Sequence, residues 1–377
     1  MAKKAYIGVD GVARKIKKGY LGIDSVARKI KKAYIGIGGV ARPCWSGGEL
    51  AYYGTITGLS SARCQHAAVS IGDYALFGGG YSGSYIKSIC VYDKSLVFSE
   101  HSTGLNGNFT YLAATTVGDY AMFGGGKESS SSVTNKTSAY NTSLTRTIPS
   151  TLSVARYSLA ATSVGGYALF GGGEGGGKVV DAYNTSLTRS IPTTLSVGRS
   201  CLAATSIGDY ALFGGGYNTN NVDVYNTSLT HSVSTMLSAG SEHLSSTSVG
   251  DYALFGGGGD STLATVYNTV NACNKSLTCS TPAPLTASRG MLAATSVGDY
   301  ALFGGGKYKS TYSTTRYNNV DAYDASLTRL ATTALSEKKS ELAATSVGDY
   351  ALFGGGDAAS GITPMSAVKT VEVYTIN

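Results

Sequence analysis

The sequence has few charged residues, few prolines and no long apolar run. Charged side chains make up 14% of the 377 residues, against about 25% in a typical domain, which excludes a coiled coil and a charge-rich disordered chain. Six prolines are too few for a collagen or polyproline chain. No stretch of about 20 apolar residues is present, and the first residues lack the apolar core of a secretory signal. We therefore expect a soluble protein without membrane insertion.

Cysteine and histidine are scarce and irregularly spaced. The six cysteines form no Cys-x-x-Cys pair and no disulfide framework; they are Cys44, Cys64, Cys90, Cys201, Cys273 and Cys279. The four histidines stand at different places in the repeat described below and show no i, i+2 or i, i+4 spacing; they are His66, His101, His231 and His243. Free thiols, no metal site, no cofactor and no catalytic residue are predicted.

Glycine is abundant, and it marks an internal repeat. The string Gly-Asp-Tyr-Ala-Leu-Phe-Gly-Gly-Gly recurs seven times with little change. Its glycine triplet begins at Gly78, Gly124, Gly171, Gly214, Gly256, Gly304 and Gly354. Copies spaced 42 to 50 residues apart match the length of a four-stranded propeller blade. The sequence therefore predicts an all-β fold with seven blades.

Each copy contains four short apolar segments. In the third copy they cover residues 158–163, 167–170, 179–183 and 187–191. Six copies carry an aspartate in the tight turn between the first two segments, and such a repeated carboxylate is predicted to be a turn residue rather than an acid or base. The seventh copy has three segments, and residues 52–57 align with the missing fourth. We expect this N-terminal strand to close the ring by pairing with the C-terminal blade.

These repeats resemble those of kelch β-propellers over residues 51 to 377. Kelch repeats have a glycine doublet after an apolar strand, a later tyrosine and an arginine before the next strand. Here the tyrosines are Tyr92, Tyr140, Tyr183, Tyr225, Tyr323 and Tyr374, and the arginines are Arg63, Arg156, Arg199 and Arg289. The sequence departs from the family at Cys273, which replaces the fifth tyrosine, and in having Trp45 as its single tryptophan. The resemblance implies a closed propeller domain over residues 46–377.

Residues 1–45 form a separate basic segment built on a 14-residue frame. Asp10-Gly11, Asp24-Ser25 and Gly38-Gly39 hold equivalent places between apolar residues, and each predicts a two-residue hairpin turn in a short β-meander. Eight lysines and three arginines against two aspartates give residues 1–42 a charge of +9, so the propeller has no excess of basic residues for nucleic acid. A segment this short needs a partner or sister chains for stability. The alternative is a basic arm whose lysines protect strand edges.

The 14-residue frame resembles segments of structural and tail proteins of tailed bacteriophages. This resemblance covers residues 1–42 and implies a virion component, made in the cytoplasm of a bacterial host, that attaches to other virion proteins through the basic segment. The expected attachment residues are Lys3, Lys4, Tyr6, Arg14, Lys17, Lys18, Tyr20, Arg28, Lys31, Lys32, Tyr34 and Arg42.

Loops on one face of the predicted propeller differ widely between copies, whereas the turns on the other face barely change. Variable loops on a constant scaffold are typical of a recognition surface, and the residue types here suit stacking on and hydrogen bonding to sugars or proteins. The expected ligand-binding residues are Tyr81, Tyr85, Lys127, Tyr217, Asn218, Asn220, Asp260, Lys307, Tyr308, Lys309 and Asp357. The alternative is solvated loops that vary freely.

Together these features predict a non-enzymatic virion protein whose propeller loops bind a host-surface receptor, a glycan or a protein. Two alternatives stay open. One is a purely structural decoration or assembly protein of the virion. The other is a carbohydrate-active enzyme with a site at the central channel, which the lack of clustered acids and metal ligands in the sequence disfavours.

Overall fold

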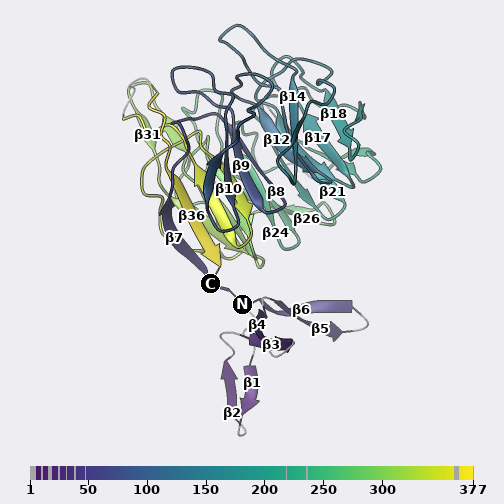
Figure 1. The fold of residues 1–377 in the computed structure, drawn as a ribbon, viewed down its shortest axis with the longest axis vertical. Coiled ribbons are helices and arrows are strands. Elements are labelled where there is room, and N and C mark those ends of the chain that lie inside the picture. The colour runs from purple at the N-terminus through teal and green to yellow at the C-terminus, as the bar shows by residue number, and fades with distance from the viewer. Residues whose placement is uncertain are drawn as a thin grey trace.

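The computed structural model describes residues 6–9, 12–15, 19–23, 26–30, 32–37, 40–46, 48–217, 219–234, 237–360 and 365–376, with side chains from residue 48 onward. Within these ranges every element is a strand, and there is no helix that could cross a membrane. Seven four-stranded antiparallel sheets stand around one axis as the blades of a β-propeller (Figure 1). The predicted fold class is confirmed.

The first strand of each blade lies nearest the axis, because these seven strands contact one another in a closed circle. They are β8 (Ala67–Ile71), β12 (Ala113–Val117), β16 (Ala160–Val164), β20 (Ala203–Ile207), β24 (Ser245–Val249), β28 (Ala293–Val297) and β34 (Ala343–Val347). The second strands are β9 (Tyr74–Gly78), β13 (Tyr120–Gly124), β17 (Tyr167–Gly171), β21 (Tyr210–Gly214), β25 (Tyr252–Gly256), β29 (Tyr300–Gly304) and β35 (Tyr350–Gly354). Small alanines occupy the inner strands, where the blades converge.

The outer half of each blade completes the sheet. The third strands are β10 (Ile89–Asp93), β14 (Thr137–Asn141), β18 (Val180–Asn184), β22 (Val222–Asn226), β26 (Val270–Asn274), β32 (Val320–Asp324) and β36 (Val371–Ile376). The fourth strands are β11 (Phe98–Glu100), β15 (Arg146–Thr147), β19 (Arg189–Ser190), β23 (His231–Val233), β27 (Cys279–Ser280), β33 (Arg329–Leu330) and β7 (Leu50–Ile56). Blade 6 adds a hairpin between its second and third strands, β30 (Lys307–Lys309) and β31 (Thr314–Arg316).

The two ends of the propeller sequence share the seventh blade. Strand β7 pairs antiparallel with β36, from Val371 opposite Ile56 to Ile376 opposite Leu50. Figure 1 shows the purple β7 beside the yellow β36. This confirms the predicted closure, which leaves the outer edge of β36 paired rather than free for aggregation.

Neighbouring blades pack through the repeated second strand. Between blades 3 and 4, Leu169 packs with Phe213 and Tyr225 in one buried cluster. The Phe213 ring lies so close to Gly171 that a Cβ there would stand 2.6 Å from it. The glycine that ends each second strand is therefore needed for close packing of the next blade.

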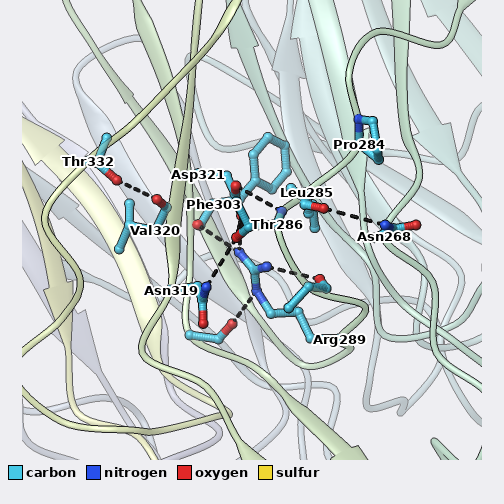
Figure 2. Close-up of polar contacts among 12 residues, drawn as sticks. Asn268, Pro284, Leu285, Thr286, Arg289, Phe303, Asn319, Val320, Asp321 and Thr332 are labelled. Carbon is cyan, nitrogen blue, oxygen red and sulfur yellow. Dashed lines mark hydrogen bonds and ion pairs between the residues drawn. The ribbon is translucent and has the colours of Figure 1, made fainter.

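Three of the four arginines before the innermost strands form buried ion pairs with the blade that follows, whereas Arg63 donates to main-chain carbonyl oxygens and Ser88 instead. Arg289 donates hydrogen bonds to Asp321 at 2.8 Å and to the carbonyl oxygen of Phe303 at 3.2 Å (Figure 2). Arg156 with Asp181 and Arg199 with Asp223 repeat the arrangement. Such pairs are structural, because removal of one partner leaves an uncompensated buried charge.

One blade carries a disulfide where three of the others pair tyrosine with arginine. Cys273 on β26 stands opposite Cys279 on β27, and their sulfur atoms are bonded. In blade 3 the same places hold Tyr183 and Arg189. The prediction that all cysteines are free thiols is therefore wrong. The sequence spacing looked irregular because the two cysteines become neighbours only across the turn between these strands.

The basic segment forms three hairpins: β1 (Tyr6–Val9) with β2 (Val12–Lys15), β3 (Gly19–Ile23) with β4 (Val26–Ile30), and β5 (Lys32–Ile37) with β6 (Val40–Ser46). Each register leaves two residues between the strands, as the turn sequences predict. Among the described residues each hairpin is a separate two-stranded sheet rather than part of one continuous meander. The side chains of the expected attachment residues lie outside the described part of the chain.

Candidate functional site

Seven residues just before the innermost strands form a ring around the propeller axis. We call this set the axial ring; it consists of Gln65, Tyr111, Ser158, Cys201, His243, Met291 and Glu341. Each main-chain N–H donates a hydrogen bond of 2.9 to 3.0 Å to the carbonyl oxygen of the ring residue in the preceding blade. The bonds run from blade to blade without a break, because Gln65 donates to Glu341 and completes the circle.

All seven ring residues have left-handed backbone conformations. Their φ angles lie between +52° and +57°, a region that side chains with a Cβ rarely adopt. The closed circle of hydrogen bonds holds them there. Backbone strain of this kind concentrates at functional sites, so the ring is the first place to look for function.

The side chains of the axial ring are all different, although their surroundings are nearly constant. Seven residue types occupy the seven positions, whereas leucine follows the ring residue in six copies and alanine comes next in six. The site was not among the sequence-based predictions, which rested on variation between whole loops rather than at single positions. The signal was present as one variable position within a repeated frame.

Three potential metal ligands meet in the ring. One donor atom each of Cys201, Glu242 and His243 lies within 4.8 Å of the other two. The sequence spacing did not indicate this cluster, and the predicted absence of a metal site stays a prediction. Cys201 precedes blade 4 and His243 precedes blade 5, so only the packing of adjacent blades brings them together.

Burial keeps the cysteine and the histidine uncharged at neutral pH. Desolvation by burial, followed by the positive charge of Lys307, lowers the pKa of His243 to about 4. Desolvation by burial, followed by the negative charge of Glu242, raises the pKa of Cys201 to about 11. His243 thus offers a lone pair that can accept a proton or bind a metal, while the Cys201 thiol is a poor nucleophile on its own.

A second polar group faces the axis from blades 1, 2, 6 and 7. The Gln65 amide donates a hydrogen bond of 2.6 Å to the Glu341 carboxylate, and the Lys307 ammonium is paired with the same carboxylate. Burial, followed by the charge of Glu341, raises the pKa of Tyr111. The Tyr111 phenol therefore stays protonated and can donate a hydrogen bond.

Several of the predicted loop residues surround the axial ring. The residue after the glycine triplet pairs through main-chain hydrogen bonds with the residue just before the ring; examples are Tyr81 with Cys64, Lys127 with Thr110, Lys307 with Gly290 and Asp357 with Ser340. Tyr217 holds the same place in blade 4 and donates its N–H to Ser200. The structure thus brings these five predicted residues into a second circle.

The remaining predicted loop residues lie farther out or make structural contacts. Tyr85 packs against Tyr81, and Tyr308 and Lys309 lie on β30. The Asn220 amide donates to the carbonyl oxygen of Leu237, and the Asp260 carboxylate accepts three main-chain N–H groups in its own turn. Asn218 lies outside the described residues, and Asp357 of the second circle is itself buried against Arg316. Ligand binding by the set stays a prediction.

Comparison with known proteins shows the fold of the chain. No family model and no curated protein sequence matches it. Among solved structures, a fungal alcohol oxidase of the AA5 family in complex with copper matches with a TM-score of 0.67 at 14% identity, over 87% of this chain and 76% of that one. The structure of YjhT matches with a TM-score of 0.58 at 11% identity, over 85% of this chain and 99% of that one.

These comparisons correct the predicted function. A non-enzymatic, receptor-binding virion protein was expected, but the alcohol oxidase shows that a propeller of this shape carries catalysis. The expectation failed because histidine and cysteine were judged by their spacing in the chain, whereas the fold collects one residue from every blade at the axis. The resemblance of residues 1–42 to bacteriophage proteins has no counterpart in the comparisons and stays a prediction. The likeness to the two solved structures shows the fold of the chain, a seven-bladed β-propeller.

Proposed function

We propose that the chain is an enzyme whose active site is the axial ring and whose substrate is a small molecule with a hydroxyl or carbonyl group. One observation carries the proposal. Seven backbone positions are held in the same strained conformation, and the side chains on them are all different. If the ring were purely structural, we would expect the same residue at this position in each blade. The next two positions behave in that way, since six copies have leucine and then six have alanine.

The dimensions of the ring favour a small substrate. Successive ring residues are joined directly by main-chain hydrogen bonds of 2.9 to 3.0 Å, so the circle is narrow. A small molecule, or the end of a larger one, fits such a site better than the middle of a polymer. The amide of Gln65, the phenol of Tyr111 and the carboxylate of Glu341 supply both donors and acceptors for an oxygen-bearing substrate.

Two groups have the chemistry for proton transfer. The protonated Tyr111 phenol can donate a hydrogen bond to a substrate oxygen. The Glu341 carboxylate, oriented by Gln65 and Lys307, can accept a proton. The fungal protein of similar fold is an alcohol oxidase in complex with copper, which supports a hydroxyl-bearing substrate here.

The test is a turnover screen of the full chain. Primary and secondary alcohols, aldehydes and esters are incubated with the protein in three reactions, with added Cu²⁺, with added Zn²⁺ and without metal, and products are followed by mass spectrometry. Tyr111→Phe and Glu341→Gln are expected to lower kcat/KM at least ~100-fold. The control is Lys94→Ala, which removes an exposed ion pair with Asp73 at the turns on the opposite face.

The screen has two outcomes against the proposal. One is the absence of turnover for every compound in all three reactions. The other is turnover that both ring variants retain in full, which would place the reaction elsewhere.

A further inference from the structure

We infer that Cys201, Glu242 and His243 form a binding site for a divalent first-row transition ion of the Zn²⁺ or Cu²⁺ class, with one coordination position left for water or substrate. The inference rests on the proposed function, since it assigns a metal to the same ring. It joins two adjacent residues, Glu242 and His243, to Cys201, which sequence spacing does not connect to them.

The distances already approach those of a metal site. The three donor atoms lie within 4.8 Å of one another, while ligands around a tetrahedral zinc ion stand about 3.5 Å apart, given bonds of about 2.0 to 2.3 Å. Side-chain rotations that move the donor atoms by about 1 Å would bring them to this separation. The main chains of the two residues are already held next to each other, since the His243 N–H is hydrogen-bonded to the Cys201 carbonyl oxygen at 3.0 Å.

The Glu242 carboxylate supports the assignment independently. The residue is 6% exposed, and no side chain or main-chain N–H of the described residues donates a hydrogen bond to its carboxylate. Its carboxylate oxygens are not among the fully buried unpaired atoms, so they still reach solvent and are accessible to an ion. A cation between Glu242, Cys201 and His243 would supply the missing partner.

The donor set selects the class of ion. Thiolate sulfur, imidazole nitrogen and a carboxylate oxygen suit Zn²⁺ and Cu²⁺, whereas Mg²⁺ and Ca²⁺ prefer oxygen ligands alone. These residues therefore fit the class to which the copper of the fungal oxidase belongs. Three protein ligands are typical of catalytic sites, which keep the fourth position open. An ion bound there would polarise a substrate oxygen or acidify a bound hydroxyl.

A thiolate and imidazolium pair is the competing interpretation of the cluster. Such a nucleophile needs a cysteine of low pKa beside a charged histidine. Burial shifts both groups in the opposite direction, with the pKa of Cys201 near 11 and that of His243 near 4. A bound cation removes this obstacle because it deprotonates a coordinating thiol.

The experiment measures metal binding without any substrate. The full chain is stripped of metal with a chelator, then titrated with Zn²⁺ by calorimetry and with Co²⁺ by absorption spectroscopy. One ion per chain is expected, and Co²⁺ should give the near-ultraviolet charge-transfer band of a cobalt–thiolate bond. Cys201→Ser should remove that band, and His243→Ala and Glu242→Gln should each weaken Zn²⁺ binding at least ~10-fold. Cys64→Ser and Gln65→Ala are matched controls that should change neither reading.

Three results would overturn the inference. They are the absence of stoichiometric binding, a charge-transfer band that survives Cys201→Ser, and binding of Mg²⁺ or Ca²⁺ in place of Zn²⁺ and Co²⁺. Circular dichroism of each variant confirms that the fold is intact. Turnover without stoichiometric metal binding would remove this inference and keep the proposed function, whereas stoichiometric Zn²⁺ binding without turnover would do the reverse.

Discussion

The main-chain N–H of Gln65 donates a hydrogen bond of 2.9 Å to the carbonyl oxygen of Glu341, which joins the first blade to the seventh at the axis. At the outside of blade 7, β7 pairs with β36. The propeller is thus closed both at its centre and at its periphery. Because the axial ring depends on unbroken contact between all seven blades, the site and the closure of the fold are linked.

His66 is predicted to destabilise the protein. It stands where the other six copies have leucine, and neither of its ring nitrogens has a hydrogen-bond partner among the described residues. His66→Leu should raise the free energy of unfolding by about 1 to 3 kcal/mol, because it removes a buried polar group that lacks a partner. Urea unfolding measures the change. Leu202→His, at the same place in blade 4, is the matched control and should destabilise; a less stable His66→Leu protein would contradict the explanation.

The same histidine predicts a pH dependence of stability. Burial, then the charges of Arg63 and Lys339, lowers the pKa of His66 well below its ordinary value of 6.5. The unfolded chain therefore binds a proton below pH 6.5 that the folded chain does not, so the free energy of unfolding should fall as the pH drops from 7 to 5. Unfolding curves at several pH values should show a shallower fall for His66→Leu. Parallel curves for the two proteins would count against this cause.

Asp223 should make the free energy of unfolding depend on pH in a lower range than His66 does. Burial alone would raise its pKa, but Arg199, the Ser196 amide and His231 together lower it below 3.8. Its contribution to stability is thus complete above that value and is lost as the pH falls through the lower folded pKa. Asp223→Asn should therefore reduce the free energy of unfolding at pH 7 by about 3 kcal/mol, since it leaves Arg199 buried without a charged partner. The difference between variant and wild type should shrink as the pH falls below 3.8 in the same urea measurement.

Removal of N-terminal residues should separate the basic segment from the propeller. A chain that starts at residue 48 keeps β7 and should unfold at the same temperature as the full protein. A chain that starts at residue 58 lacks β7, exposes the edge of β36 and should be much less stable and prone to aggregate. Thermal unfolding and size-exclusion chromatography compare the two. Equal stability would show that the ring does not need its closing strand.

The disulfide predicts a response to reductant. Reduction of the Cys273–Cys279 bond should lower the free energy of unfolding by about 2 kcal/mol, because a short loop in the unfolded chain is no longer closed. The double variant Cys273→Tyr with Cys279→Arg restores the pair found in blade 3 and should be insensitive to reductant. Unfolding in urea with and without reductant checks both statements, and a wild-type protein that reductant leaves unchanged would refute the first.

The sequence by itself determined the architecture of the chain. Seven glycine triplets at 42 to 50 residues, the apolar second strands and the alignment of residues 52–57 with a missing fourth strand gave the number of blades and the place of closure. These features are visible because propeller contacts are local within each repeat. The two-residue turns of the basic segment could be predicted for the same reason, since Val9 and Val12 pair across a turn that their own sequence specifies.

The tertiary structure decided which residues meet. Cys201 and His243 are 42 positions apart and look unrelated in the sequence, yet the circle of blades places them side by side with Glu242. The same holds for Glu341 and Gln65, which come from opposite ends of the repeat array. Repetition fixes the shape of each blade, but only the closed circle brings one variable residue from each blade to the axis, and the chemistry of the site arises there.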